Sequence, residues 1–235
     1  LMPVFALFFP IPIAVASTAV VHIANNVFRV IFAGKGADWK VVFAFGIPAS
    51  VCAIPGALFL LQVADISPIT TYEIKGGTFE ITTIKLAVAG LILAFAAFEL
   101  IPSLNRTEFP RNWMSLGGAL SGFLGGLSGH QGALRSAVLA NAGLTASEFV
   151  GTVSVCAFMV DISRLAVYGI AFLAQDFSQV SEGNNITLVA VATVAAFLGT
   201  YTSSKFLKQV TMKAIRRIVG IMLVVIGLAL GTGLV

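Results

Sequence analysis

The sequence predicts an all-α polytopic membrane protein built from two inverted repeats, each a broken, glycine-rich helical hairpin followed by three transmembrane helices. Three observations predict this fold. Of the 235 residues, 58% are hydrophobic and only 10% are charged, whereas about 25% of residues are charged in a soluble domain. The hydrophobic residues form long runs and do not alternate as they do in an outer-membrane barrel. The two halves of the chain also share an order of small, polar and charged residues.

The composition excludes two classes of protein. A water-soluble globule is excluded because one hydrophobic core cannot bury this much apolar surface. Intrinsic disorder is excluded because it requires low hydrophobicity and high charge. The net charge of +4 is typical of basic cytoplasmic loops in a membrane protein and does not indicate a nucleic-acid partner. The two cysteines, Cys52 and Cys156, lie in apolar runs and indicate no redox compartment.

Six apolar runs are near or above the ~20 residues that a membrane-spanning helix requires. In chain order they are 11–33, 39–63, 84–103, 148–173, 184–203 and 218–235. Residues 1–9 are apolar but too short to cross. Residues 113–143 are longer than one span and are interrupted by Gly, Ser, His, Gln and Arg. We therefore interpret 113–143 as a helical hairpin that is broken near Ser128–Gly132.

An internal repeat relates the two halves of the chain. ASTAVVHIANNVFRV, at residues 16–30, aligns with GTVSVCAFMVDISRL, at residues 151–165, so that small hydroxyl residues, an amide or carboxylate, and an arginine coincide. The coinciding pairs are Ser17 with Thr152, Asn26 with Asp161, and Arg29 with Arg164. Repeats of this kind are typical of secondary transporters.

The repeat divides the chain into a first repeat, 1–103, a cytoplasmic linker, 104–112, and a second repeat, 113–235. Nothing in the first repeat matches the glycine-rich Gly117–Arg135 of the second. We therefore expect that most of the first hairpin is missing from the N-terminal end of this sequence.

Loop charges orient the repeats. Three loops, 34–40, 104–112 and 204–217, are rich in Lys and Arg, which the positive-inside rule places in the cytoplasm. Loops 64–82 and 174–183 are acidic and are predicted outside. Loops that are equivalent under the repeat thus lie on opposite sides, so the two halves are predicted to be inverted. This holds if the predicted hairpin enters and leaves on one side.

The break in this hairpin is the first candidate site. An unwound point inside a membrane protein is tolerated only where it is buried or lines a cavity. A second arm that begins near Gly132 presents free N–H groups and the positive end of its dipole. His130, Gln131 and Arg135 add donors and a fixed charge. This set suits a small oxyanion. The alternative is a packed glycine hairpin whose polar residues satisfy one another.

The second candidate site consists of Asn25, Asn26, Arg29, Asp161 and Arg164. A charge inside a span costs several kcal/mol unless it is paired or hydrated, so these residues are expected to face the interior. The spacing of three residues places Asp161 and Arg164 on one helix face. The alternative is a structural ion pair, with Arg29 extending to the cytoplasmic surface.

Three further polar residues lie in the same predicted helices. Ser17 and Thr152, near the helix starts, either donate hydroxyl groups to the same cavity or pack helices together. His22 lies in the middle of its span, where it could titrate or bridge helices. A single histidine in such a position favours a packing role.

The glycine-rich run continues into a recognisable pattern. GGALSGFLGGLSGHQGALRSAVLANAGLTASEFVGTVSV, from Gly117, resembles the sulfite exporter TauE/SafE family, also called the toluene-sulfonate uptake permease superfamily. Its members carry a glycine-rich hairpin, a turn and a small-hydroxyl helix start twice per chain, and residues 1–29 look like the tail of the first copy. Gly129–Gly132 stands where a glycine tract is common. The resemblance implies transport of sulfite, sulfonates or related sulfur-containing anions across a bacterial inner membrane, without a cofactor.

These observations predict a secondary transporter, a permease or exporter, and not an enzyme. It would bind a small anion at the two candidate sites and work by alternating access in a lipid bilayer. Coupling to protons or another ion, and assembly into a homo-oligomer, are compatible with the sequence. The alternatives are an intramembrane enzyme that uses His130 as acid or base, and a non-transporting membrane subunit. No Walker A loop, HExxH or GxSxG motif supports ATP-driven transport or a standard hydrolase, and no metal site is predicted.

Overall fold

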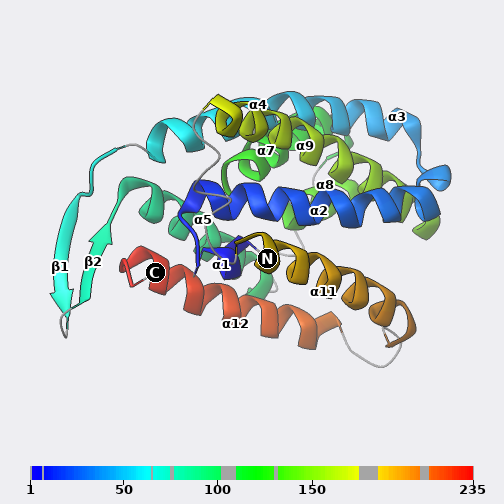
Figure 1. The fold of residues 1–235 in the computed structure, drawn as a ribbon. Helices are drawn as coiled ribbons and strands as arrows, with labels where there is room; N and C mark the ends of the chain where they lie inside the picture. Colours follow the sequence, from blue (N-terminus) through cyan, green and yellow to red (C-terminus); the bar gives the residue numbers. More distant parts are fainter. Residues whose placement is uncertain are drawn as a thin grey trace.

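A computed structural model describes residues 2–6, 8–64, 66–74, 77–101, 110–129, 132–174, 185–206 and 212–234. It is a bundle of long helices with a β-hairpin at one end (Figure 1). In chain order the elements are α1 (Met2–Phe5), α2 (Ile11–Ala33), η1 (Gly34–Gly36), α3 (Trp39–Val41), η2 (Val42–Gly46), α4 (Ile47–Ala64), β1 (Thr70–Ile74), β2 (Gly77–Ile81), α5 (Thr83–Leu100), η3 (Arg111–Trp113), α7 (Met114–Ser128), α8 (Gly132–Leu139), α9 (Ala146–Ala174), α11 (Asn185–Phe206) and α12 (Met212–Gly231).

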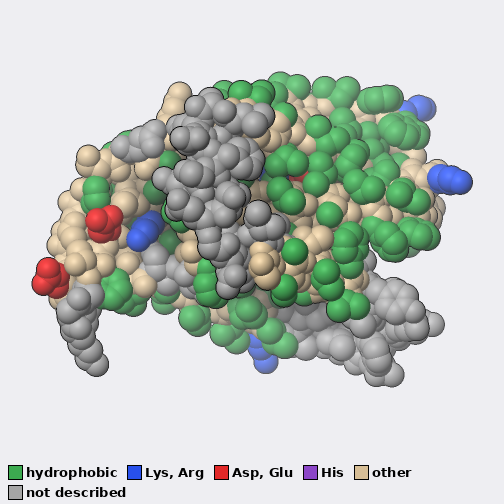
Figure 2. All heavy atoms as spheres, in the orientation of Figure 1, with side chains coloured by type: hydrophobic (Ala, Val, Ile, Leu, Met, Phe, Trp, Pro, Cys, Tyr) green, Lys and Arg blue, Asp and Glu red, His purple; other side chains and the backbone are tan. Residues whose placement is uncertain are grey.

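The mostly helical prediction is confirmed, and each of the six apolar runs is occupied by a helix. Within the described residues, four helical stretches are long and apolar enough to cross a membrane: Ile11–Gly36, Trp39–Ala64, Thr83–Leu100 and Ala146–Ala171. The apolar parts of α11 and α12 found there are shorter, at Ala190–Gly199 and Arg217–Gly231. Hydrophobic side chains cover the body of the bundle (Figure 2), and Phe32 and Ile170 remain 71% and 69% exposed.

The second span begins at a capped end and contains a π-helical segment. The Asp38 carboxylate accepts hydrogen bonds from the backbone N–H groups of Lys40 and Val41, and thus satisfies donors at the helix start. Directly after α3 the helix winds as η2, a π-helix that begins at Val42, before it continues as α4. The Ser115 hydroxyl, from α7, donates to the Ala44 carbonyl within this segment at 3.0 Å. This bond joins the wide turn to the neighbouring helix.

Helix α7 packs against α4 along a row of glycines, which we call the glycine ridge: Gly118, Gly122 and Gly126. A Cβ atom at Gly122 would lie 1.9 Å from the carbonyl oxygen of Ala49. The corresponding distances at Gly118 and Gly126, to carbonyls of the same helical stretch, would be 2.4 and 2.2 Å. Only glycine allows two helix backbones to approach this closely. The clustered glycines thus bring the backbones of the two helices into contact.

The hairpin predicted over 113–143 is broken where the sequence indicates. Helix α7 ends at Ser128, and Gly129 follows in the left-handed region with φ 71°. This conformation is favourable for glycine and costly for other residues. Helix α8 then begins at Gly132 and is short, with 8 residues. The break therefore places the C-terminal end of one helix and the N-terminal end of another near each other.

The next helix, α9, begins with a reciprocal cap. The Glu148 carboxylate accepts hydrogen bonds from both the backbone N–H and the hydroxyl of Thr145, each at 2.8 Å. The Thr145 hydroxyl in turn accepts one from the backbone N–H of Glu148. This is a capping box, which fixes the helix start. The Glu148 carboxylate also lies in the first turn of α9, where the positive end of the helix dipole stabilises a negative charge.

The two-stranded hairpin is an addition to the predicted all-α fold. Strands β1 and β2 pair antiparallel, with Thr70 opposite Ile81, inside the acidic loop 64–82. The rings of Tyr72 and Phe79, which are direct cross-strand partners, stack with centroids 5.6 Å apart. The Tyr72 hydroxyl also donates to the Thr232 carbonyl beyond α12. The hairpin is therefore attached to the end of the last helix.

Helices that the repeat makes equivalent lie next to each other. Helix α2 packs along α9, and α5 packs along α12 (Figure 1). This arrangement is compatible with two related halves, but the inversion remains a prediction. The loops whose charges predict the inversion lie largely outside the described residues, because these residues do not include 102–109, 175–184 and 207–211.

Candidate functional site

A cavity of about 250 Å³ lies where α1, α2, α8 and α9 meet the break after α7. Its walls contain residues from both candidate sites of the sequence analysis. The lining residues are Met2, His22, Asn25, Asn26, Arg29, Gly129, Gly132, Arg135, Ala157 and Arg164. The structure thus combines the hairpin break and the polar residues of the paired helices into one site.

Helix α2 supplies one polar wall of the cavity. His22, Asn25, Asn26 and Arg29 are spaced by three, four and seven residues, which places them on one face of a helix. Asn26 is buried, and the other three are partly exposed. The rings of Phe28 and Phe32, which are both exposed, lie tilted against each other on another side of α2, with centroids 4.5 Å apart. The helix therefore separates a lipid-type surface from a polar one.

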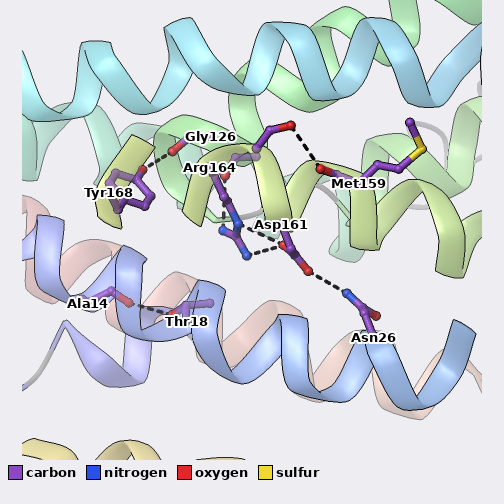
Figure 3. Close-up of polar contacts among 10 residues, drawn as sticks. Ala14, Thr18, Asn26, Gly126, Met159, Asp161, Arg164 and Tyr168 are labelled. Atoms are coloured by element: carbon purple, nitrogen blue, oxygen red, sulfur yellow. Dashed lines mark hydrogen bonds and ion pairs between the residues drawn. The ribbon is translucent and has the colours of Figure 1, made fainter. Parts of the chain in front are cut away.

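Helix α9 contributes a buried ion pair. The guanidinium of Arg164 approaches Oδ1 of Asp161 through Nη2 at 2.7 Å and donates to the same oxygen through Nε at 3.0 Å. Asn26 Nδ2, from α2, donates to Oδ2 at 2.7 Å. Figure 3 shows both side chains converging on this carboxylate. Asp161 and Arg164 are 0% and 1% exposed, so the pair is shielded from water.

The same arginine also neutralises the broken end of α7. Arg164 Nη1 lies 3.4 Å from the Gly125 carbonyl oxygen, and the Tyr168 hydroxyl donates to the carbonyl of Gly126 (Figure 3). The last carbonyls of a helix lack intrahelical partners and form the negative end of its dipole. Donors from α9 therefore add to the hydrogen bonding of this end, and Arg164 joins it to the Asp161 carboxylate.

Arg135 is in a different situation. It lies in the first turn of α8, is 8% exposed, and lines the cavity. Its Nε and Nη1 atoms have no hydrogen-bond partner in the described part of the chain. A buried donor without a partner costs about 1–3 kcal/mol, and more when it is charged. Arg135 therefore provides unused hydrogen-bonding capacity and a positive charge at the cavity wall.

The remaining predicted site residues are placed as follows. Gly132 lines the cavity at the start of α8, whereas His130 and Gln131 lie outside the described residues. Asp161 does not line the cavity itself but binds two residues that do. Arg29, for which the alternative was an extension to the cytoplasmic surface, lines the cavity and is partly exposed.

The two small hydroxyl residues do not belong to the cavity. The Thr152 hydroxyl accepts a hydrogen bond from the backbone N–H of Asp38 at 3.0 Å, and thereby holds the start of α3. Ser17 is 9% exposed on α2 and is not among the described residues that line the cavity. Of the two readings of these hydroxyls, structural contact between helices is the one that the geometry supports.

His22 and Met2 line the cavity although the sequence analysis did not assign them to the site. For His22 a signal was present, because it precedes Asn25 and Asn26 by three and four residues and so shares their helix face. For Met2, an apolar residue on a short helix, the sequence offered no signal.

A bundle of apolar, membrane-length helices around a buried polar cavity defines an integral, multi-pass membrane protein of the transporter class. The family model of the sulfite exporter TauE/SafE matches residues 1–230. The chain therefore belongs to the sulfite exporter TauE/SafE family, whose members are membrane exporters of sulfur-containing anions. No curated protein and no solved structure matches the chain significantly.

Proposed function

We propose that this protein is a secondary transporter that carries a small oxyanion, such as sulfite, a sulfonate or a related sulfur-containing anion, through the cavity between α2, α8 and α9. The observation that supports it most is Arg135, a buried guanidinium on the cavity wall, two of whose nitrogens have no hydrogen-bond partner among the described residues. Arginine in this state matches an oxyanion, which accepts its forked N–H groups. Gly132 adds the backbone N–H groups and positive dipole of the α8 start.

In this proposal the anion contacts both halves of the chain. Arg135 and the start of α8 hold it from the second half, while Asn25 and Arg29 face it from α2 in the first half. Arg164 and Asp161 position the wall and do not bind the anion directly. Alternating access would then move one half against the other around the bound anion. The hydrogen bond from Asn26 to Asp161 joins the two halves. This bond would either break or persist as the halves move.

Flux of labelled sulfite into proteoliposomes tests this function with Arg135→Gln as the principal variant. We expect the variant to lose about tenfold or more in apparent affinity, because a charge-assisted hydrogen bond is worth about 1.5–3 kcal/mol. Arg135→Lys should recover part of the loss, since it restores the charge without the fork.

Arg217→Gln is the matched control. Arg217 is exposed near the start of α12 and does not line the cavity. The control should transport with wild-type affinity. If folded Arg135→Gln protein also transports with wild-type affinity, the anion does not bind in this cavity. If no variant, and not even the wild type, moves any anion, the proposed function is wrong.

A further inference from the structure

The charges around the cavity indicate which anions it accepts, provided that the proposed function holds. Three guanidinium groups line it: Arg29, Arg135 and Arg164. Arg164 is paired with Asp161, whose two carboxylate oxygens are both occupied, Oδ1 by Arg164 and Oδ2 by Asn26. This pair is neutral as a unit, so the single negative charge of Asp161 is balanced by Arg164.

Arg29 and Arg135 remain as uncompensated cations. Within the described residues neither forms an ion pair, and the Asp161 carboxylate is already paired with Arg164. The other titratable group on the described wall is His22. With a neutral imidazole, the described wall carries two net positive charges, because three guanidinium groups face one carboxylate.

We infer that the cavity selects a doubly charged oxyanion over a singly charged one of the same shape. A dianion neutralises both Arg29 and Arg135, whereas a monoanion leaves one buried cation uncompensated. Uncompensated charge is costly in a buried, poorly solvated site. A monoanion relieves this cost for one of the two cations and a dianion relieves it for both, so the dianion gains more electrostatic free energy on binding. Because Arg29 comes from α2 and Arg135 from α8, the dianion would also attract both walls toward itself.

Sulfate and perchlorate provide a matched pair of probes. Both are tetrahedral with four equivalent oxygens, and at pH 8.5 both are fully ionised, so that they differ by one unit of charge. The experiment measures how strongly each anion inhibits the flux of labelled sulfite into proteoliposomes. Thiosulfate and methanesulfonate serve as a second pair of dianion and monoanion. Perchlorate is the more weakly hydrated of the first pair and loses less hydration on binding. Tighter binding of sulfate would therefore arise from the site and not from solvation.

We expect each dianion to inhibit at a concentration at least tenfold below that of its monoanionic counterpart. Arg29→Gln should lower this preference by tenfold or more, because it leaves one net charge on the wall. Arg29→Lys should retain the preference, and so should the surface control Arg217→Gln. Comparison of Arg29→Lys with Arg29→Gln distinguishes the loss of charge from damage to the fold.

The outcomes separate the inference from the proposed function. Equal or tighter inhibition by the monoanions, with Arg135→Gln still weakening sulfite transport, overturns the dianion preference and leaves the transport function intact. An unchanged preference in folded Arg29→Gln protein also overturns the inference, because the second charge would then play no part. Absence of flux and of inhibition by every anion overturns both.

Discussion

Asp161 is the residue that holds the polar centre together, because its carboxylate binds Arg164 on its own helix and Asn26 on α2. Removing it leaves a buried guanidinium without a counter-charge. We expect Asp161→Ala to lower the free energy of unfolding by about 3–5 kcal/mol. The double variant Asp161→Ala/Arg164→Leu should be less damaging, since it removes both charges.

Chemical unfolding of the purified protein in detergent measures this difference. The single variant Arg164→Leu completes the double-mutant cycle and gives the coupling energy of the pair. Equal stability of the wild type, both single variants and the double variant would contradict a buried, coupled pair. It would also remove the reason for treating Arg164 as neutralised in the cavity.

At the same scale, the sequence predicts local pairs better than distant ones. The spacing of Asp161 and Arg164 predicts that they share a face, and the structure places them in contact. The contact of Thr152 with Asp38 was not predictable, because 114 residues separate the partners and a hydroxyl can satisfy itself in many ways. His130 and Gln131 remain predictions, since they lie outside the described residues.

At the scale of elements, the glycine ridge determines how α4 and α7 fit together. We expect Gly122→Ala to destabilise the protein by at least about 1–3 kcal/mol, the usual cost of overpacking, because the new methyl group would lie 1.9 Å from the Ala49 carbonyl oxygen. Gly90→Ala is the matched control, since a Cβ atom there meets nothing within 4 Å on helix α5.

The control should be neutral or stabilising by about 0.5–1 kcal/mol, because alanine is the better helix residue. Thermal unfolding of the two variants in the same detergent compares them directly. Similar shifts in the unfolding temperature for both substitutions would mean that α7 does not contact the α4 backbone at Gly122.

The elements themselves were largely predictable, because long apolar runs leave few alternatives to helices. The glycine cluster indicated close packing but not its partner, since every helix of this composition offers small residues. The β-hairpin was missed although TTYEI and TFEI, two runs rich in β-branched and aromatic residues, stand on either side of Lys-Gly-Gly in the sequence, a pattern that favours a hairpin.

For the whole molecule, the inverted arrangement is the prediction that most needs a test. We expect cysteines introduced at Ser178 and Ser204, in a background without Cys52 and Cys156, to react with impermeant thiol reagents from opposite sides of the membrane. The reason is that loop 174–183 is acidic and loop 204–217 is rich in Lys and Arg.

Thr71, on the β-hairpin, serves as the matched control for this experiment. It belongs to the acidic loop 64–82 and should be labelled from the same side as Ser178. Labelling of Ser178 and Ser204 from one side would contradict the inverted arrangement. Labelling of Thr71 and Ser204 from the same side would contradict it as well. The repeat makes loops 64–82 and 204–217 equivalent, and an inverted arrangement places them on opposite sides of the membrane.

The glycine ridge has a mechanical consequence for the whole molecule. Backbone rests on backbone between α4 and α7 from both sides, because a Cβ atom at Gly56 of α4 would also lie 2.2 Å from the Phe123 carbonyl oxygen of α7. These two helices therefore form a stiff unit that transmits force without sliding. Helices α2 and α9 approach closely at the end of α2, where a Cβ atom at Gly151 would lie 2.6 Å from the Ala33 carbonyl oxygen. Beside the cavity they are joined by side chains, including the bond of Asn26 to Asp161. Strain that arises at the cavity wall will be relieved at this side-chain contact, next to the left-handed turn at Gly129.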